Sequence, residues 1–313
     1  MSFRSLIKTI IKTSSITSLG ISSLVAFTSP SKAENFNMKA CPASGTADAT
    51  LANIIALGGE CLHTPDQYKL TIYEMGLCKT DPISTGVFLK EANGCVQTML
   101  STSGSEIDLA PGNSSEKIAA LPSASSRPAS GSYPHAYVLL SNGFKMKGTY
   151  QLADGTTYYS KESTDAYGTF GAADKTLSAA AEHTDLVDNM YFGDDENGWD
   201  GVMSATAMPG SGTVSALLLK ECVDDTCVGA SAVASSQGEV KRLLGVFSNT
   251  GSPVEILDST NGIEVQLIVK ADPKNPENSG GGYLLIGWDQ GDGNGFDLRM
   301  FGSAPFKPKF TTF

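Results

Sequence analysis

Six cysteines carry the clearest chemistry in this sequence of 313 residues. An even number is typical of disulfide bonds, which form in oxidising compartments outside the cytosol. The shortest loops favour pairing in chain order. Zinc is the alternative, but the sequence has no CxxC pair and no histidine at ligand spacing from a cysteine. The expected bonds are Cys41–Cys61, Cys78–Cys95 and Cys222–Cys227.

Two acidic loops are candidates for binding Ca²⁺. This ion takes many oxygen ligands, and glycine-rich turns allow carboxylates and carbonyls to converge on it. Neither loop has the spacing of an EF-hand, and solvated turns at hairpin ends are the alternative interpretation. No other cofactor is expected. The candidate ligands are Asp194, Asp195 and Asp200 in the first loop, and Asp289, Asp292, Asn294 and Asp297 in the second.

Residues typical of catalytic sites form no recognisable motif. The histidines His63, His135 and His183 lie far apart, and the sequence contains neither HExxH nor GxSxG. The glycines over 291–295 lack the following helix that phosphate binding requires. We therefore expect a non-catalytic protein. A secreted hydrolase remains an alternative, because a Ser-His-Asp site can be assembled from residues distant in sequence.

Residues 1–33 have the features of a secretory signal peptide. Basic residues up to Lys12 precede an apolar stretch over 16–27, and small residues lead to a cleavage position after Ala33. A membrane anchor is the alternative, but the apolar stretch is shorter than the roughly 20 residues that a span needs. The sequence thus predicts export to the extracellular space or cell surface, with the periplasm as a further destination, and no membrane span after cleavage.

The charge balance excludes some partners. The chain has 22 basic and 33 acidic residues, a formal charge of −11, and removing the four basic groups of residues 1–33 makes it −15. Nucleic-acid binding depends on clustered Lys and Arg, so we expect no nucleic-acid partner. Anionic lipid surfaces should repel the mature chain.

Strand patterns dominate the mature chain. Before them, a short helix is expected over 46–57, with Thr46 as its cap and Gly58-Gly59 after its end. A second helix or an irregular loop is expected over 175–190. The turns Asn142-Gly143 and Asp154-Gly155 predict a three-stranded meander over 136–160, and a further hairpin is expected over 283–301.

These patterns predict an all-β protein with little helix: an antiparallel, jelly-roll-like β-sandwich with hairpin meanders, pinned by disulfides. The expected organisation is a signal peptide (1–33), a cysteine-rich β segment with a short helix packed on the same sandwich (34–121), a Pro/Ser linker (122–131) and the main sandwich (132–313).

Export, β structure and disulfides together suggest a structural or surface protein, one that self-assembles into an extracellular filament or matrix. Its partner would be another copy of itself. An N-terminal arm without periodicity could pair with a neighbour's open sheet. The alternative is a binding module for a glycan or a surface protein, an adhesin, using the loops at 161–212 and 289–297. The arm comprises Glu34, Asn35, Phe36, Asn37 and Met38.

Overall fold

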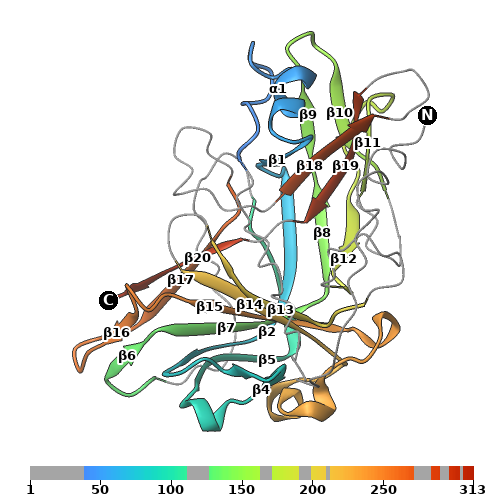
Figure 1. The fold of residues 1–313 in the computed structure, drawn as a ribbon. Coiled ribbons are helices and arrows are strands. Elements are labelled where there is room, and N and C mark those ends of the chain that lie inside the picture. The colour runs from blue at the N-terminus through green and yellow to red at the C-terminus, as the bar shows by residue number, and fades with distance from the viewer. Residues whose placement is uncertain are drawn as a thin grey trace, which may run out of the picture. The chain divides into compact units, whose positions relative to one another are not determined.

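A computed structural model describes most of the chain (Figure 1). It covers residues 39–110, 127–162, 171–189, 199–208, 212–270, 283–289, 296–303 and 306–313. The predicted signal peptide, the N-terminal arm and the first half of the predicted linker lie outside these residues. The predictions for those segments therefore remain predictions.

The described elements are mostly strands. The helical elements are α1 (Leu51–Ala56), η2 (Glu91–Asn93), η3 (Asp224–Cys227), η4 (Ala230–Ala232) and η5 (Gln237–Glu239). The strands of the first half are β1 (Glu60–His63), β2 (Gln67–Cys78), β3 (Ile83–Ser84), β4 (Val87–Phe88), β5 (Val96–Asp108), β6 (Gly131–Tyr133), β7 (His135–Ser141), β8 (Gly143–Lys147), β9 (Thr149–Gln151) and β10 (Thr157–Ser160). Those of the second half are β11 (Gly171–Asp174), β12 (His183–Leu186), β13 (Val202–Ala207), β14 (Thr213–Leu219), β15 (Arg242–Ser248), β16 (Val254–Ile256), β17 (Ile263–Ile268), β18 (Tyr283–Asp289), β19 (Phe296–Ser303) and β20 (Lys307–Thr312).

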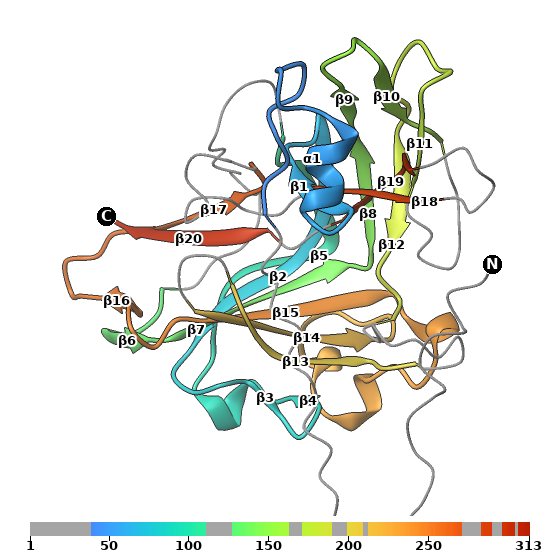
Figure 2. The ribbon, with the colours of Figure 1, turned by 45° about the horizontal axis from the view of Figure 1, so that its top comes forward.

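Two large antiparallel sheets organise these strands. One has the order β1-β18-β19-β11-β10-β9, and the other has the order β12-β8-β2-β7-β15-β14-β13 with β5 also paired to β2. The pairs β16–β6, β17–β20 and β3–β4 form small two-stranded sheets. Figure 2 shows α1 next to β1, with which it is in contact. The predicted all-β class, with antiparallel strands, disulfides and little helix, is confirmed.

One hydrophobic core joins the two large sheets. Tyr68 and Phe144 contribute to it from the eight-stranded sheet, and Tyr150 and Phe301 from the six-stranded sheet. Ile54 of α1 completes this side of the core. Each such side chain is nearly or fully buried, and burying one stabilises the fold by about 1.5–3 kcal/mol.

The predicted turn at Asn142-Gly143 is wrong, and with it the three-stranded meander. Strands β7 and β8 do not pair with each other but follow one another along the same edge of β2, from His135 opposite Cys78 to Lys147 opposite Gln67. Neither residue of the dipeptide has the positive φ that a type I′ turn requires. The long strand β2 offers a partner to the whole stretch, and this pairing overrides the local turn signal.

Asn142 marks a change of neighbour along this stretch. Its backbone N–H donates to Lys241 O at 3.4 Å, next to β15, and its carbonyl accepts from Val187 N at 2.8 Å, next to β12. The outer edge therefore pairs with β15 before Asn142 and with β12 after it.

Two other predicted hairpins are confirmed. Strands β9 and β10 pair across the turn at Asp154-Gly155, where Gly155 has a φ of 90°. Strands β18 and β19 also pair antiparallel, with a register shift after Ile286. The loop between them, 290–295, lies outside the described residues.

The first helix is shorter than predicted, and over 175–190 the structure has mostly the irregular loop that was the alternative to a helix. Helix α1 starts at Leu51 with Thr50 as its cap, whereas the Thr46 hydroxyl donates to Ala43 O in the preceding turn. Within 175–190, the described residues contain no helix but strand β12. Successive side chains of a strand point to opposite faces of the sheet. In β12, His183 and Asp185 are therefore buried, while Thr184 and Leu186 are half-buried.

The structure joins the cysteines in chain order, as Cys41–Cys61, Cys78–Cys95 and Cys222–Cys227. These bonds fit an oxidising environment outside the cytosol. In the part of the chain that the structure describes, no helix is both long and apolar enough to cross a lipid bilayer.

Candidate functional site

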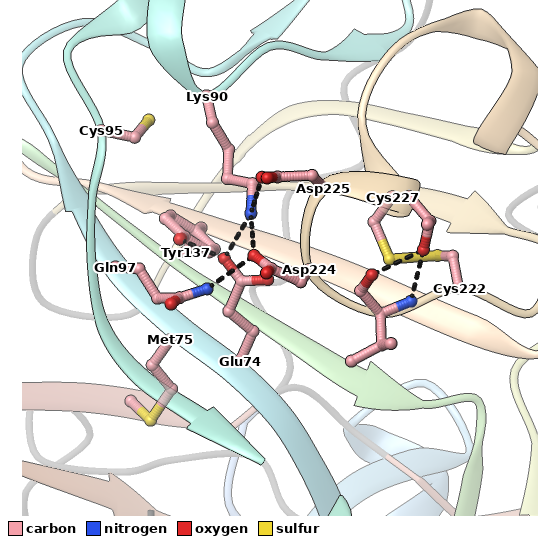
Figure 3. Close-up of polar contacts among 12 residues, drawn as sticks. Glu74, Met75, Lys90, Cys95, Gln97, Tyr137, Cys222, Asp224, Asp225 and Cys227 are labelled. Atoms are coloured by element: carbon pink, nitrogen blue, oxygen red, sulfur yellow. Dashed lines mark hydrogen bonds and ion pairs between the residues drawn. A yellow bond between two sulfur atoms is a disulfide. The ribbon is translucent and has the colours of Figure 1, made fainter. Parts of the chain in front are cut away.

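The most concentrated polar chemistry in the described residues surrounds the ammonium group of Lys90 (Figure 3). Its Nζ lies 2.9 Å from Glu74 Oε1, 3.1 Å from Asp224 Oδ1 and 3.4 Å from Asp225 Oδ1. Nζ donates hydrogen bonds to Glu74 and Asp224, and Asp225 adds an ion pair. We call Glu74, Lys90, Asp224 and Asp225 the Lys90 cluster.

Three separate segments bring the cluster together. Glu74 is on β2, Lys90 follows β4, and Asp224 begins η3 inside the loop closed by the Cys222–Cys227 bond. Asp224 adopts a φ of 53°, a left-handed conformation that is uncommon for residues other than glycine. The disulfide loop therefore holds Asp224 in a fixed position in front of Lys90.

Glu74 is the most deeply buried member of the cluster. Its side chain is 1% exposed, and that of Lys90 is 11% exposed. Glu74 Oε1 also accepts a hydrogen bond of 2.5 Å from the Tyr137 hydroxyl, while Oε2 is buried with no hydrogen-bond partner among the described residues. A buried carboxylate of this kind is stable only because a cation lies against it.

The outer carboxylates are more accessible. Asp224 is 41% exposed and Asp225 is 89% exposed. Gln97 on β5 donates from Nε2 to Asp224 Oδ1 at 3.0 Å, which orients the carboxylate that Lys90 also contacts. The cluster thus runs from a buried carboxylate to a solvent-facing one.

Lys90 and Asp224 each stabilise the charged form of the other. Burial alone would lower the pKa of Lys90, but the hydrogen bonds and charges of Glu74 and Asp224 outweigh it and raise that pKa. Burial would likewise raise the pKa of Asp224, but Lys90 and Gln97 lower it. Lys90 and Asp224 therefore rest as an ion pair at neutral pH.

The sequence contains one signal for this cluster that our sequence analysis missed. Glu74 is the one charged residue among the otherwise apolar residues 72–78 of β2, all but one of which are buried. A charged residue buried in such a strand needs a partner of opposite charge. The register shift between Ile72 and Glu74 turns Glu74 to the face of Leu139 and Tyr137, opposite to that of Ile72. Lys90 and Asp224 have no comparable signal, because only the tertiary fold brings them to Glu74.

A cavity of about 430 Å³ lies at another place, where β6, β7, β14, β15, β16 and β20 meet. Its volume is in the range of small-ligand sites. Its walls include aromatic rings and prolines together with hydroxyls, an amide and both signs of charge. The lining residues that matter most here are Tyr133, Phe247, Phe310, Ser248, Asn249 and Lys309.

The three histidines have separate surroundings. His63 Nε2 lies 2.9 Å from Thr149 O, and His135 Nδ1 lies 2.7 Å from the Oγ of Ser248, which lines the cavity. His183 is buried on β12. Burial lowers the pKa of all three imidazoles.

The Ca²⁺ prediction remains a prediction for most of its residues. Asp194, Asp195, Asp292 and Asn294 lie outside the described residues, and the side chain of Asp289 does too. Asp200 Oδ1 accepts from Val202 N within its own turn, at 2.8 Å. Among the described residues, no group of three acidic, histidine or cysteine side chains is arranged to hold a metal ion.

Asp297 is engaged with other side chains. Its Oδ2 lies 2.9 Å from Lys175 Nζ, and its Oδ1 accepts from the Tyr158 hydroxyl. Ca²⁺ at this carboxylate would have to displace the Lys175 ammonium.

Comparison of the chain with protein-family models, curated proteins and solved structures finds no match.

Proposed function

We propose that this protein is a secreted, non-catalytic structural protein that self-assembles at the cell surface through its N-terminal arm. The observation that carries the proposal is the way the chain enters the fold. Ala40 pairs with Leu62 of β1 in a parallel bridge, with hydrogen bonds of 2.7 Å from Cys41 N to Leu62 O and 2.9 Å from Leu62 N to Lys39 O.

This pairing lies on the outer edge of β1, the first strand of the six-stranded sheet. The chain therefore enters the fold already extended and already hydrogen-bonded as a strand. The residues before it in the mature chain, Glu34 to Met38, are well suited to pair as a strand with an edge on another copy.

Strand β13 is the acceptor we favour. It ends the order of the eight-stranded sheet and, among the described residues, pairs only with β14. Its sequence, Val-Met-Ser-Ala-Thr-Ala, contains no charge and no proline. Edges of this composition lack the residues that usually prevent strand addition.

The test compares the chain starting at Glu34 with a chain starting at Lys39. We expect the longer chain to form assemblies in size-exclusion chromatography with light scattering and in negative-stain images, and the shorter chain to be monomeric. Ala205→Lys places a charge on an exposed position of β13 and should also prevent assembly. Ser132→Lys, at an exposed position of β6, is the control. Equal assembly of both chains would refute the proposal.

A second candidate function is a binding module, and the cavity at Phe247 and Phe310 is the observation that favours it. Aromatic rings beside hydroxyl and amide groups suit stacking against a sugar ring. A glycan array would test this candidate, and Phe310→Ala should abolish any binding that the array detects. Binding that is insensitive to this change would exclude the cavity as the site.

A further inference from the structure

We propose that Lys90 and Asp224 condense into an intramolecular amide bond, with Glu74 as the proton acceptor. The bond would join the segment after β4 to the loop of the Cys222–Cys227 disulfide. It would be a covalent modification site that does not depend on self-assembly.

The reacting groups are already in contact. Lys90 Nζ lies 3.1 Å from Asp224 Oδ1, although the two residues are 134 positions apart in sequence. Holding an amine and a carboxyl group in such a contact replaces an encounter in solution and greatly raises their effective concentration. Gln97 and the disulfide loop restrict the carboxylate to this position.

The reaction needs no oxidant or cofactor. The neutral amine of Lys90 attacks the Cγ of the protonated Asp224 carboxyl group, and the N–C bond forms. One proton leaves the nitrogen for Glu74, which returns it to the departing hydroxyl group. The C–O bond breaks, one water leaves, and the amide N–H and C=O remain. No atom changes oxidation state in the overall condensation.

The reactive neutral pair arises from the resting ion pair when a proton moves from Nζ to the Asp224 carboxylate. Burial penalises both charges, but the hydrogen bonds and charges of the cluster outweigh that penalty, so the neutral pair is a minor state. The lasting contact between the two groups keeps this minor state positioned for reaction. Glu74 suits the role of proton acceptor, because Oε1 lies 2.9 Å from Nζ and Oε2 has no hydrogen-bond partner among the described residues. The Tyr137 hydroxyl fixes its orientation.

Asp224 is better placed than Glu74 or Asp225 to supply the acyl group of the amide. Glu74 is only 1% exposed, so water leaving from it would have no direct path to solvent. Asp225 is farther from Nζ, at 3.4 Å, and its side chain is 89% exposed, so water competes for this contact. Asp224, partly buried and partly open to solvent, combines contact with an exit for the water.

The test is the mass of the purified mature protein. We expect the intact mass to be lower, by one water, than the mass of the sequence with its three disulfides. After reduction and trypsin digestion, the peptide with Lys90 should remain joined to the peptide with Asp224.

Four variants define the mechanism. Lys90→Arg keeps the charge but cannot form the amide, so it should have the full mass. Glu74→Gln removes the proton acceptor and should leave most of the protein uncrosslinked. Asp224→Asn should lose ammonia in place of water, which is a positive signature of the same bond. Lys69→Arg is the matched control, because Lys69 contacts Glu182 at the same distance, 3.1 Å, in a half-buried pair outside the cluster.

Full mass in the wild-type protein would overturn the proposal, and so would a crosslink from Lys90 to Glu74 or Asp225. Undiminished crosslinking in Glu74→Gln would overturn the role of Glu74. Circular dichroism of each variant separates loss of the bond from loss of the fold, and Asp224→Asn gives a readout that does not depend on Glu74→Gln folding.

Discussion

The ring of Tyr137 lies over Gly76 on the neighbouring strand, and this contact allows the Tyr137 hydroxyl to reach Glu74. The two residues are opposite each other in the pairing of β2 with β7. A Cβ at Gly76 would lie 2.4 Å from Tyr137 Cε1 and 2.6 Å from the Tyr137 hydroxyl oxygen. These distances are too short for any side chain, so the position requires glycine for steric reasons.

Gly76→Ala should therefore displace the Tyr137 ring and lower the free energy of unfolding by about 1–3 kcal/mol, the usual cost of overpacking. Urea denaturation measures this loss. Gly245→Ala is the matched control on β15, because its Cβ would meet no atom closer than 3.6 Å. The steric explanation fails if the two variants unfold at the same urea concentration.

Acidification should destabilise the fold through its histidines. Burial lowers the pKa of His63, His135 and His183 in the folded state. Between the lowered pKa values and about 6.5, the ordinary pKa of histidine, the unfolded chain binds more protons. The stability that neutral imidazoles contribute is therefore complete above about 6.5 and is lost as pH falls below it.

Urea denaturation at pH 7.5 and pH 5.5 would measure this dependence. His63→Gln should weaken it, because the glutamine amide can still donate to Thr149 O but does not titrate. A stability that is the same at both pH values in the wild-type protein would contradict the prediction.

The disulfides should differ in their contribution to stability because they close loops of different length. Replacing Cys41 and Cys61 by serine opens a loop with a separation of 20 residues, and replacing Cys222 and Cys227 opens one with a separation of 5. Chain entropy predicts costs of about 3 and about 2 kcal/mol, respectively. Thermal melting of the two double variants checks the order, and the reverse order would contradict the chain-entropy explanation.

Arg242 should not tolerate replacement by lysine. Its guanidinium carbon lies 3.8 Å from the centre of the Tyr73 ring, and its Nε donates to Cys222 O at 3.1 Å. Lysine keeps the charge but loses the planar stacking and the directed hydrogen bond, so Arg242→Lys should cost about 1 kcal/mol. A double-mutant cycle with Tyr73→Leu would isolate the contact, and a coupling energy near zero would refute it.

Local sequence patterns predicted the class of the fold because alternation on β2, β17 and β19 is a property of single strands. The hairpins β9–β10 and β18–β19 were also predictable, since a strand, a short turn and a second strand are contiguous in sequence. Loop length favoured pairing of the cysteines in chain order without excluding the other connectivities, and the structure has the chain-order pairing. These features depend on residues that are close along the chain.

The path of the chain at Asn142-Gly143 and the Lys90 cluster depend on residues that are distant in sequence. Asn142-Gly143 carries a strong turn signal, but nothing near it reveals that β2, some 70 positions earlier, is long enough to pair with both flanking segments. The Lys90 cluster was missed for the same reason. Glu74 alone was detectable, as the one charged residue among residues 72–78 of β2, whereas its contact with Lys90 depends on the path of the chain after β4.

Strands β7 and β8 form one continuous stretch along β2, and this arrangement affects how the protein unfolds. On the edge away from β2, β15 pairs with β7 and β12 pairs with β8, and the partner changes at Asn142. Both β15 and β12 pair with this one continuous stretch of backbone, so release of the stretch from β2 disturbs the pairing of both. We therefore expect unfolding in a single step, and force applied to one end of this stretch should be borne by both neighbouring strands together.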